Sequence, residues 1–426
     1  MSATAAPASR LSPMAAGLLG SEILRIAAQI RAMVAEGKEV ANLTVGDFAP
    51  ADFPVPAALV DGIVDALRAG QTNYPPSNGL PELRAAIVEF YRRRMSLEIT
   101  DANVLVASGA RPVLYATYAT LCAPGDRVVF PVPSWNNNHY CHLVGAQAVR
   151  VPCGPEDDFL PTRASLERAV RGARLLVLTS PCNPTGTMFR EEQLADICDL
   201  VLEENARRDA GERPLYVLYD QVYWMLTFGG VDHVTPVLLR PEMAPFTVAI
   251  DGISKALAAT GLRVGWSVAP AEITSAMSDF LGHVGAWAPR AEQVATAKVL
   301  DAPDDIERYI GDFKAGIQKR LDALYSGIAS MREEGLPVDA TSPMGAMYLS
   351  ARFALNGKRT PDGKTLRTND DIRRYLLEAA GFAVVPFQAF GVKEDTGWFR
   401  LSVGAVSLAD TERVLPALRK AIESVT

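Results

Sequence analysis

Short apolar runs alternate with stretches of helical spacing over most of the chain. Runs rich in β-branched residues occupy 104–107, 127–130, 148–151, 175–179, 215–219, 247–250 and 264–268. Continuous apolar runs of this length are typical of strands buried on both faces. The alternation therefore predicts an α/β fold, a large domain whose mostly parallel sheet is sandwiched by helices.

The C-terminal part of the chain does not continue this regular alternation of strands and helices. Residues 306–332 have the spacing of one long helix, and strand-like runs follow at 347–351, 383–385 and 398–403, which indicates a smaller α+β domain. A length of 426 residues also favours two domains. We predict an N-terminal arm at 1–18, a segment at 19–55 that packs with the small domain, a large domain at 56–310 and a small domain at 311–426. The polar stretch 356–369 is expected to be a flexible insertion.

Composition excludes several classes of protein. A net charge of −7 without a basic stripe argues against binding nucleic acid. No apolar run approaches the ~20 residues of a membrane span, and the first residues lack the features of a signal peptide. The five cysteines are scattered, which indicates reduced thiols and a cytoplasmic location. His139 and His142 flank Cys141, but no further ligands stand at a spacing suited to zinc, so we expect no metal site.

Reactive side chains collect where the predicted strands end. Lys255 follows the run 247–250, and a lysine amine can form a Schiff base with an aldehyde. Ser254 and Arg263 offer a hydroxyl and a guanidinium fork that suit a phosphate. An aldehyde and a phosphate on one small molecule describe pyridoxal 5′-phosphate (PLP).

Other strand ends supply what such a cofactor needs. Asp220 follows 215–219, and PLP needs a carboxylate to keep its pyridine nitrogen protonated, although an Asp here could also cap a helix. After 104–107, a small-residue turn and a helix start at 108–112 expose backbone N–H groups to an anion. After 175–179 comes Asn183, in a segment that could also be an ordinary Asn-Pro turn.

Together these motifs resemble those of class I/II PLP-dependent aminotransferases of the aspartate aminotransferase type. The resemblance rests on Gly-Ile-Ser-Lys at 252–255, Thr-Gly-Leu-Arg at 260–263, Tyr-Asp-Gln-Val-Tyr at 219–223 and Asn-Pro-Thr-Gly at 183–186. The motifs stand in family order over nearly the whole chain. The resemblance implies the PLP-dependent transferase fold and a homodimer whose active sites are shared between subunits.

It also implies a role for each matching residue. Lys255 would hold the cofactor and act as the catalytic acid–base, with Asp220 on the ring nitrogen and Tyr223 and Asn183 on the ring hydroxyl. Asn183, Gly46 and Arg400 would bind the substrate. The remaining cofactor contacts would come from the phosphate-binding residues Gly109, Ala110, Arg111, Ser254 and Arg263, from Trp135 on the ring face, and from Tyr74 on the phosphate of the neighbouring subunit. For Trp135 and Tyr74 plain packing is the alternative, and for Arg400 a salt bridge at the rim.

The implied reaction is transfer of an amino group from an L-amino acid to a 2-oxo acid by a ping-pong mechanism. In one subgroup a cation at the position of Arg111 binds the distal carboxylate. The partner-chain arginine of another subgroup is absent from 282–289, and Pro386-Phe387 replaces the usual Pro-Gly. We therefore expect aspartate-type or broad specificity. A PLP-dependent lyase of the C–S or cyclising type is the alternative, and a regulatory effector-binding domain with the same fold is another.

Overall fold

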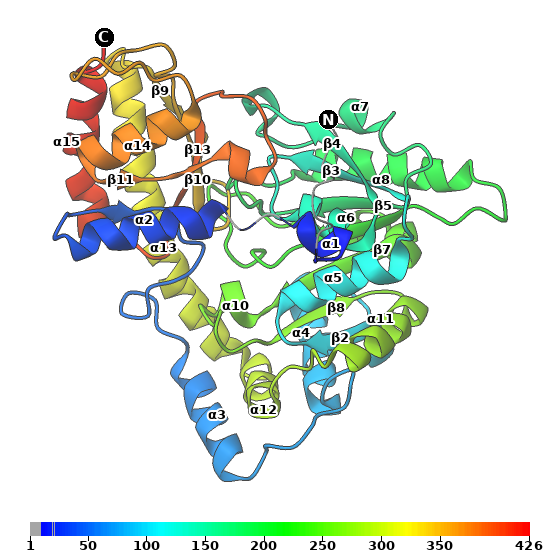
Figure 1. The fold of residues 1–426 in the computed structure, drawn as a ribbon. Coiled ribbons are helices and arrows are strands. Elements are labelled where there is room, and N and C mark those ends of the chain that lie inside the picture. Colours follow the sequence, from blue (N-terminus) through cyan, green and yellow to red (C-terminus); the bar gives the residue numbers. More distant parts are fainter. Residues whose placement is uncertain (1–9, 19, 21) are drawn as a thin grey trace.

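The computed structural model describes residues 10–18, 20 and 22–426, so residues 1–9 of the predicted arm lie outside the described part. Two groups of elements stand side by side in Figure 1. One is a large sheet with helices on both faces. The other surrounds the C-terminus and includes the N-terminal helix α2 (Glu22–Ala35).

Within the described residues the large sheet has seven strands. In spatial order they are β2 (Val104–Ala107), β8 (Gly265–Val268), β7 (Thr247–Gly252), β6 (Tyr216–Asp220), β5 (Leu175–Thr179), β3 (Arg127–Val132) and β4 (Gln147–Pro152). Only β8 runs antiparallel to its neighbours β2 and β7 among these strands, and the remaining pairs are parallel. The predicted mostly parallel sheet is confirmed.

Helices cover both faces of this sheet because its strands are apolar on both sides. In β5, Leu175 and Val177 pack in the cluster that includes helices α5 (Ala110–Leu121), α6 (Asn137–Val144) and α11 (Ala271–Val284). Leu176 and Leu178 point the other way, into the cluster under α8 (Glu191–Ala206). Alternate residues of one strand thus enter different layers, as expected for a strand buried on both faces.

Helix ends carry the sequence signals that start and stop them. Helix α4 (Pro81–Met95) begins with Pro81, whose missing N–H costs nothing in the first turn, and it has Glu82 near its start and Arg92, Arg93 and Arg94 at its end. The remaining helices around the large sheet are α1 (Pro13–Ala16), α3 (Ala57–Arg68), α7 (Arg163–Leu166), α9 (Pro236–Leu239), α10 (Ile253–Ala256), α12 (Arg290–Leu300) and the 3₁₀ turns η1 (Asp101–Asn103), η2 (Pro155–Asp157) and η3 (Pro241–Phe246).

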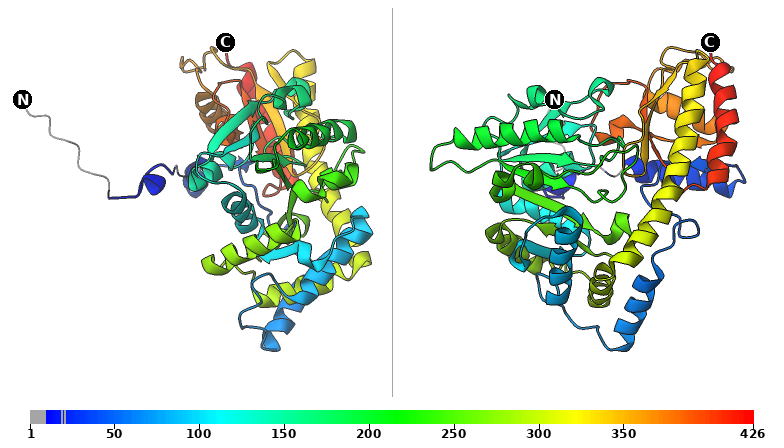
Figure 2. Two further views of the ribbon diagram at one scale, coloured as in Figure 1. Left: turned by 90° about the vertical axis from the view of Figure 1, so that its right-hand side faces the viewer. Right: turned by 180° about the vertical axis from the view of Figure 1, so that it is seen from behind.

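The second group is built on an antiparallel sheet. Its order is β12 (Val385–Pro386), β13 (Trp398–Ser402), β10 (Tyr348–Phe353) and β9 (Val338–Ala340), and it packs with α13 (Pro303–Glu333), α14 (Asn369–Ala380), α15 (Leu408–Glu423) and η4 (Phe387–Phe390). The N-terminal segment joins this group, because β1 (Ala41–Asn42) pairs in parallel with β11 (Phe382–Ala383). Figure 2 shows α13 in yellow, running from this group to the large sheet. The predicted boundary at 310/311 falls inside that helix, and the domain boundaries remain predictions.

Two local expectations need correction. The run 383–385 is not one strand, since Ala383 ends β11 and Val385 begins β12, and these strands belong to different sheets. The stretch 356–369, expected to be flexible, is tied to the chain end by reciprocal backbone hydrogen bonds between Arg359 and Thr426, and it buries Leu366. The sequence pattern missed these contacts because they join segments far apart in the chain. No helix of the described residues is long and apolar enough to cross a membrane.

The parallel strands bring distant motifs to one edge of the large sheet. β3, β5, β6 and β7 all end at this edge, and the candidate residues Trp135, Asn183, Asp220 and Lys255 stand at or just after those ends. Carboxyl ends of parallel strands are where α/β proteins bind ligands. The close approach of β8 to the turn after β2 depends on Gly265.

Replacing Gly265 with alanine should destabilise the protein by about 1–3 kcal/mol, the ordinary cost of overpacking. A Cβ there would lie 2.3 Å from Ala110 N and 2.4 Å from Gly109 C, and backbone atoms cannot give way cheaply. The matched control is Gly311→Ala in helix α13, where a Cβ meets open space and alanine is the better helix former. Chemical denaturation of both variants checks this. Equal stability of the two would contradict the tight contact.

Candidate active site

A cavity of about 470 Å³ opens at the carboxyl edge of the large sheet. Most residues proposed from the sequence line it: Gly46, Ala110, Arg111, Trp135, Asn183, Asp220, Tyr223, Ser254, Lys255, Arg263 and Arg400. They come from segments up to 354 residues apart, since Gly46 and Arg400 belong to the N-terminal and C-terminal parts of the chain. Gly109 directly precedes the lining residue Ala110 in the chain, and neither Gly109 nor Tyr74 is itself part of the lining.

Lys255 extends from α10 toward the N-terminal segment, and its Nζ donates a hydrogen bond to Gly46 O at 2.7 Å. Burial lowers the pKa of Lys255 to about 8, and the guanidinium groups of Arg400, Arg111 and Arg263 act in the same direction, while Asp47 opposes them. The amine is therefore much closer to its neutral, nucleophilic form than a solvated lysine at the same pH.

Asp220 is the last residue of β6 and faces the same cavity. Burial raises the pKa of Asp220 to about 6, against the opposing effects of a hydrogen bond from Val222 N and the charge of Lys255. At neutral pH and above it is mostly a carboxylate. A carboxylate here is able to accept a hydrogen bond from a protonated ring nitrogen.

One end of the cavity is suited to a phosphate. Helix α5 starts at Ala110, so its first free N–H groups point toward this end. Gly109 has φ +87°, and a Cβ on it would lie 2.2 Å from Arg263 Nη2. Arg263 is fixed by hydrogen bonds to Thr260 O at 2.6 Å and Ser108 O at 3.1 Å. Only glycine lets the turn approach the guanidinium this closely.

The other end is suited to a carboxylate. Arg400 is 2% exposed and donates to Asn183 Oδ1 at 3.1 Å and Thr44 O at 2.6 Å. Its guanidinium lies between two aromatic rings, 4.7 Å from that of Tyr348 and 4.9 Å from that of Phe390. Arg400 Nε has no hydrogen-bond partner among the described residues. A buried, rigid guanidinium with an unused donor is prepared for an anionic group.

A further guanidinium, that of Arg111, lies over the ring of Trp135, with 4.8 Å between the guanidinium carbon and the ring centroid. Arg111 stands in the first turn of α5, and both residues line the cavity. Stacking on an aromatic ring fixes the position of an otherwise flexible side chain.

Tyr74 is separate from the cavity of its own chain. Its side chain is 79% exposed, and its ring packs at 5.1 Å from that of Trp287. Its role on the phosphate of a neighbouring subunit stays a prediction.

Several cavity residues were missed from the sequence, and three of them, Asp47, Thr260 and Tyr348, form hydrogen bonds across the site. Asp47 accepts a hydrogen bond from Thr260 Oγ1 at 2.6 Å, which joins the N-terminal segment to the loop after Lys255. Tyr348 Oη lies 2.7 Å from Tyr223 Oη, and a Cβ on Gly46 would come within 3.0 Å of Tyr348 Oη. Asp47 and Thr260 belong to sequence motifs from which only Gly46 and Arg263 were predicted as site residues. Tyr348 lies in a predicted strand, and nothing in the local pattern indicates which face of that strand meets the cavity.

Behind Lys255 lies a buried polar network. Asp251 Oδ2 accepts hydrogen bonds from Tyr91 Oη and Trp224 Nε1, both at 2.7 Å, and Trp266 Nε1 donates to Tyr91 Oη at 2.9 Å. Burial raises the pKa of Asp251 to about 7 against these hydrogen bonds. The network joins β7, β8 and α4, and so fixes the strand end that carries Lys255.

Comparison with known proteins agrees with this geometry. The family model "Aminotransferase class I and II" matches residues 38–418. The chain belongs to this family. An aspartate aminotransferase of Rhizobium meliloti (strain 1021) is 31% identical over 99% of this chain and 97% of its own.

Two solved structures are similar over the whole fold. The aspartate aminotransferase from Rhizobium meliloti has a TM-score of 0.89 at 29% identity, covering 98% of this chain and 100% of its own. The aspartate aminotransferase from Thermus thermophilus has a TM-score of 0.85 at 26% identity, covering 97% and 100%. The chain is a PLP-dependent aminotransferase with the PLP-dependent transferase fold, and the alternative of a lyase is not favoured.

In the cofactor-free aminotransferase, Lys255 should react with trinitrobenzenesulfonate at a lower pH than ordinary lysines. The neutral amine is the reactive form, so labelling should rise through pH 8, whereas solvated lysines need a pH near ~10.4. Peptide mapping by mass spectrometry measures each lysine separately, and Lys255→Arg identifies the peptide. A Lys255 profile that coincides with those of exposed lysines would contradict the lowered pKa.

Proposed function

We propose that this aminotransferase transfers the amino group of an aspartate-type L-amino acid to a 2-oxo acid, with broader donors also accepted. The observation that carries the proposal is a pair of guanidinium groups, those of Arg400 and Arg111, that line one cavity and are each held against aromatic rings. Two fixed cations suit the two carboxylates of a dicarboxylic amino acid. The related Thermus thermophilus enzyme is described with maleate, which is a dicarboxylate.

The cavity fits PLP by its donor set. The α5 N-terminus and Arg263 would hold the phosphate, together with the backbone N–H groups of Gly109, Ala110 and Arg111 and the hydroxyl group of Ser254. The side chain of Arg111 is then available to the second substrate carboxylate. Asp220 is assigned to the ring nitrogen, Tyr223 and Asn183 to the ring hydroxyl and Trp135 to the ring face. Lys255 Nζ is assigned to the aldehyde carbon, as a Schiff base. Bound PLP supplies an electron sink that stabilises negative charge at the substrate's α-carbon.

The protein's own groups then bind, orient and move a proton. Arg400, with Asn183 beside it, holds the substrate α-carboxylate, and Gly46 leaves room for the substrate because it has no Cβ. Once the substrate amine has displaced it from the aldehyde carbon, Lys255 Nζ, whose pKa is about 8, would take the α-proton as general base and would deliver it as general acid to that former aldehyde carbon. Tyr223, held by Tyr348, keeps its phenol proton, since burial raises its pKa well above the usual range. Donor and acceptor use the site in turn, so ping-pong kinetics are expected.

Arg111→Met should lower kcat/KM for aspartate by roughly 10- to 100-fold, because hydrogen bonds to a charged group are lost. The kcat/KM for a donor with one carboxylate, such as alanine, should change little. Arg400→Met is the matched control and should impair both donors, because both carry an α-carboxylate. Coupled assays with a panel of amino acids measure this. An equal loss for both donors in Arg111→Met would assign the side chain of Arg111 to the cofactor phosphate and not to the second carboxylate.

A homodimer with shared active sites is part of the same proposal. The outer face of α3 exposes Val60, Val64 and Leu67, at 46%, 37% and 51%, in one helical stripe. Exposed Tyr74 follows in the loop after α3, so a second copy of this chain that covers the stripe would also cover Tyr74. A cytoplasmic location also stays a proposal, in agreement with five free thiols of which none is exposed.

Val64→Glu combined with Leu67→Glu should convert the dimer to a monomer of 45.8 kDa and lower transaminase activity. Two charges in an apolar interface are costly to desolvate. Leu238→Glu, on an exposed residue of α9, is the control and should remain dimeric. Analytical ultracentrifugation gives the mass. Wild-type protein that sediments as a fully active monomer would exclude both the dimer and the role of Tyr74.

A further inference from the structure

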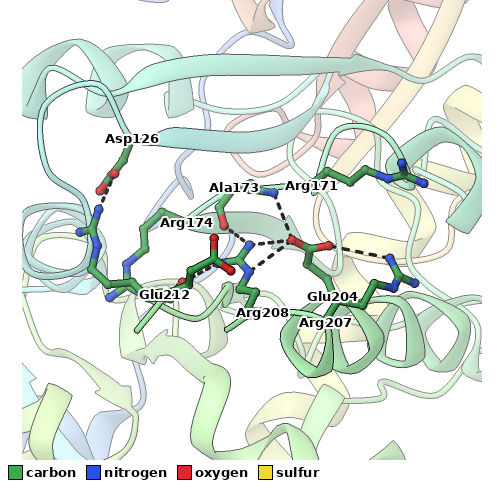
Figure 3. Close-up of a pocket in the computed structure, with 10 residues that line it drawn as sticks. Asp126, Arg171, Ala173, Arg174, Glu204, Arg207, Arg208 and Glu212 are labelled. Carbon is green, nitrogen blue, oxygen red and sulfur yellow. Dashed lines mark hydrogen bonds and ion pairs between the residues drawn. The ribbon is translucent and has the colours of Figure 1, made fainter. Parts of the chain in front are cut away.

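A second cavity lies at the opposite edge of the large sheet, away from the residues assigned to catalysis. Its volume is about 630 Å³, within the usual range of about 300–1,000 Å³ for small-molecule sites. It forms where β3, β5 and β6 begin, between the turn 171–174, the C-terminal end of α8 and the loop 207–213. Figure 3 shows the charged side chains that surround it. We call it the arginine pocket.

The arginine pocket carries excess positive charge. Five guanidinium groups line it, those of Arg171, Arg174, Arg207, Arg208 and Arg213, against three carboxylates, those of Asp126, Glu204 and Glu212. The lining is thus positive by two charges, in a chain whose net charge is −7. A local field of sign opposite to that of the whole protein indicates attraction of an anion.

Two of the three carboxylates hold the walls together, and the third, Glu212, accepts a hydrogen bond from Asp209 N at 3.0 Å. Asp126 pairs with Arg213 at 2.5 Å and accepts from Ala123 N at 2.7 Å. Glu204, which is 6% exposed, accepts from Arg208 at 3.0 Å and from Gly172 N at 3.1 Å. These contacts fix Arg208 and Arg213 as rigid parts of the wall.

The other three arginines differ in how far they are neutralised. Arg171 is 3.8 Å from Glu167, and Arg207 is 3.0 Å from Glu203, which it shares with Arg163, and 3.9 Å from Glu204. Arg174 has no ion pair among the described residues. It donates to the carbonyls of Leu121 and Pro214 and lies 4.9 Å over the ring of Tyr216.

Arg174 is thus held in place by neutral groups. Burial lowers its pKa, and the nearby charge of Arg213 adds to the effect. Placing an anion between these cations would relieve their repulsion.

We propose that the arginine pocket binds a small polyphosphate through two or more of its phosphate groups. Guanidinium forks match phosphate oxygens in bidentate geometry, and the walls present them from three separate segments. Within the described residues the lining includes no aromatic side chain, and the nearby ring of Tyr216 is covered by Arg174. Recognition therefore rests on phosphate groups and not on a nucleotide base.

The test is isothermal titration of the PLP-loaded enzyme with tripolyphosphate, pyrophosphate and ADP at low ionic strength. Loading with PLP occupies the active-site phosphate position, so that it does not compete. The wild type should bind tripolyphosphate more tightly than pyrophosphate, and ADP no more tightly than pyrophosphate. Arg171→Glu combined with Arg207→Glu should weaken binding by roughly 10- to 100-fold, because charge-assisted hydrogen bonds are lost and repulsion is added.

The control is Arg92→Glu combined with Arg308→Glu, which makes the same charge change at exposed arginines that do not line the pocket. It should bind tripolyphosphate as the wild type does, and both double variants should keep transaminase activity. If the double variant does not fold, the single variant Arg171→Glu replaces it in the test, because that side chain is 64% exposed. It should lose less affinity for tripolyphosphate than the double variant. Equal weakening in the control, absence of binding by the wild type, or ADP binding tenfold tighter than pyrophosphate would each overturn the proposal.

Discussion

The active site depends on keeping a lysine amine close to neutral inside a cavity that also holds three guanidinium groups. Burial alone lowers the pKa of Lys255, and Arg400, Arg111 and Arg263 lower it further. The same cations would make the cavity unstable if carboxylates were absent. Asp47 and Asp220 partly balance them, and each is placed by a different part of the chain. Catalytic reactivity and anion binding thus arise from one arrangement of charges.

The N-terminal segment 44–47 completes that arrangement because it lies between the two groups of elements. Its backbone carbonyls accept from Arg400 and Ser402 on the C-terminal side, and from Lys255 Nζ on the side of the large sheet. The side chain of Asp47 adds a hydrogen bond from Thr260. A short stretch without a strand of its own therefore couples Arg400 to Lys255. Displacement of this segment would alter both at once.

Much of this site could be predicted from sequence, because most of its residues follow parallel strands. Such strands are apolar on both faces, so their ends are visible as the points where polar residues begin, as at Asp220 and Lys255. Side chains placed by antiparallel pairing or by burial could not be predicted in this way. Tyr348 reaches the cavity through the register of β10 against β13, and the side-chain partners of Asp251 come from α4 and from the segment after β6. Local patterns contain no information about such pairings.

The active-site cavity at the carboxyl edge of the large sheet and the arginine pocket at its amino edge present cationic groups in different ways. At the carboxyl edge the anion-binding groups include helix N–H donors and buried, ring-stacked arginines, which give orientation as well as charge. At the amino edge the side chains of Arg171, Arg207 and Arg213 are more than half exposed, whereas Arg208 and Arg174 are held by a carboxylate and by backbone carbonyls, so the site combines fixed guanidinium groups with solvated ones. The first construction suits a reaction, in which atoms must be placed accurately. The second suits reversible binding of a flexible polyanion, and its strength should fall with ionic strength because exposed charges are screened.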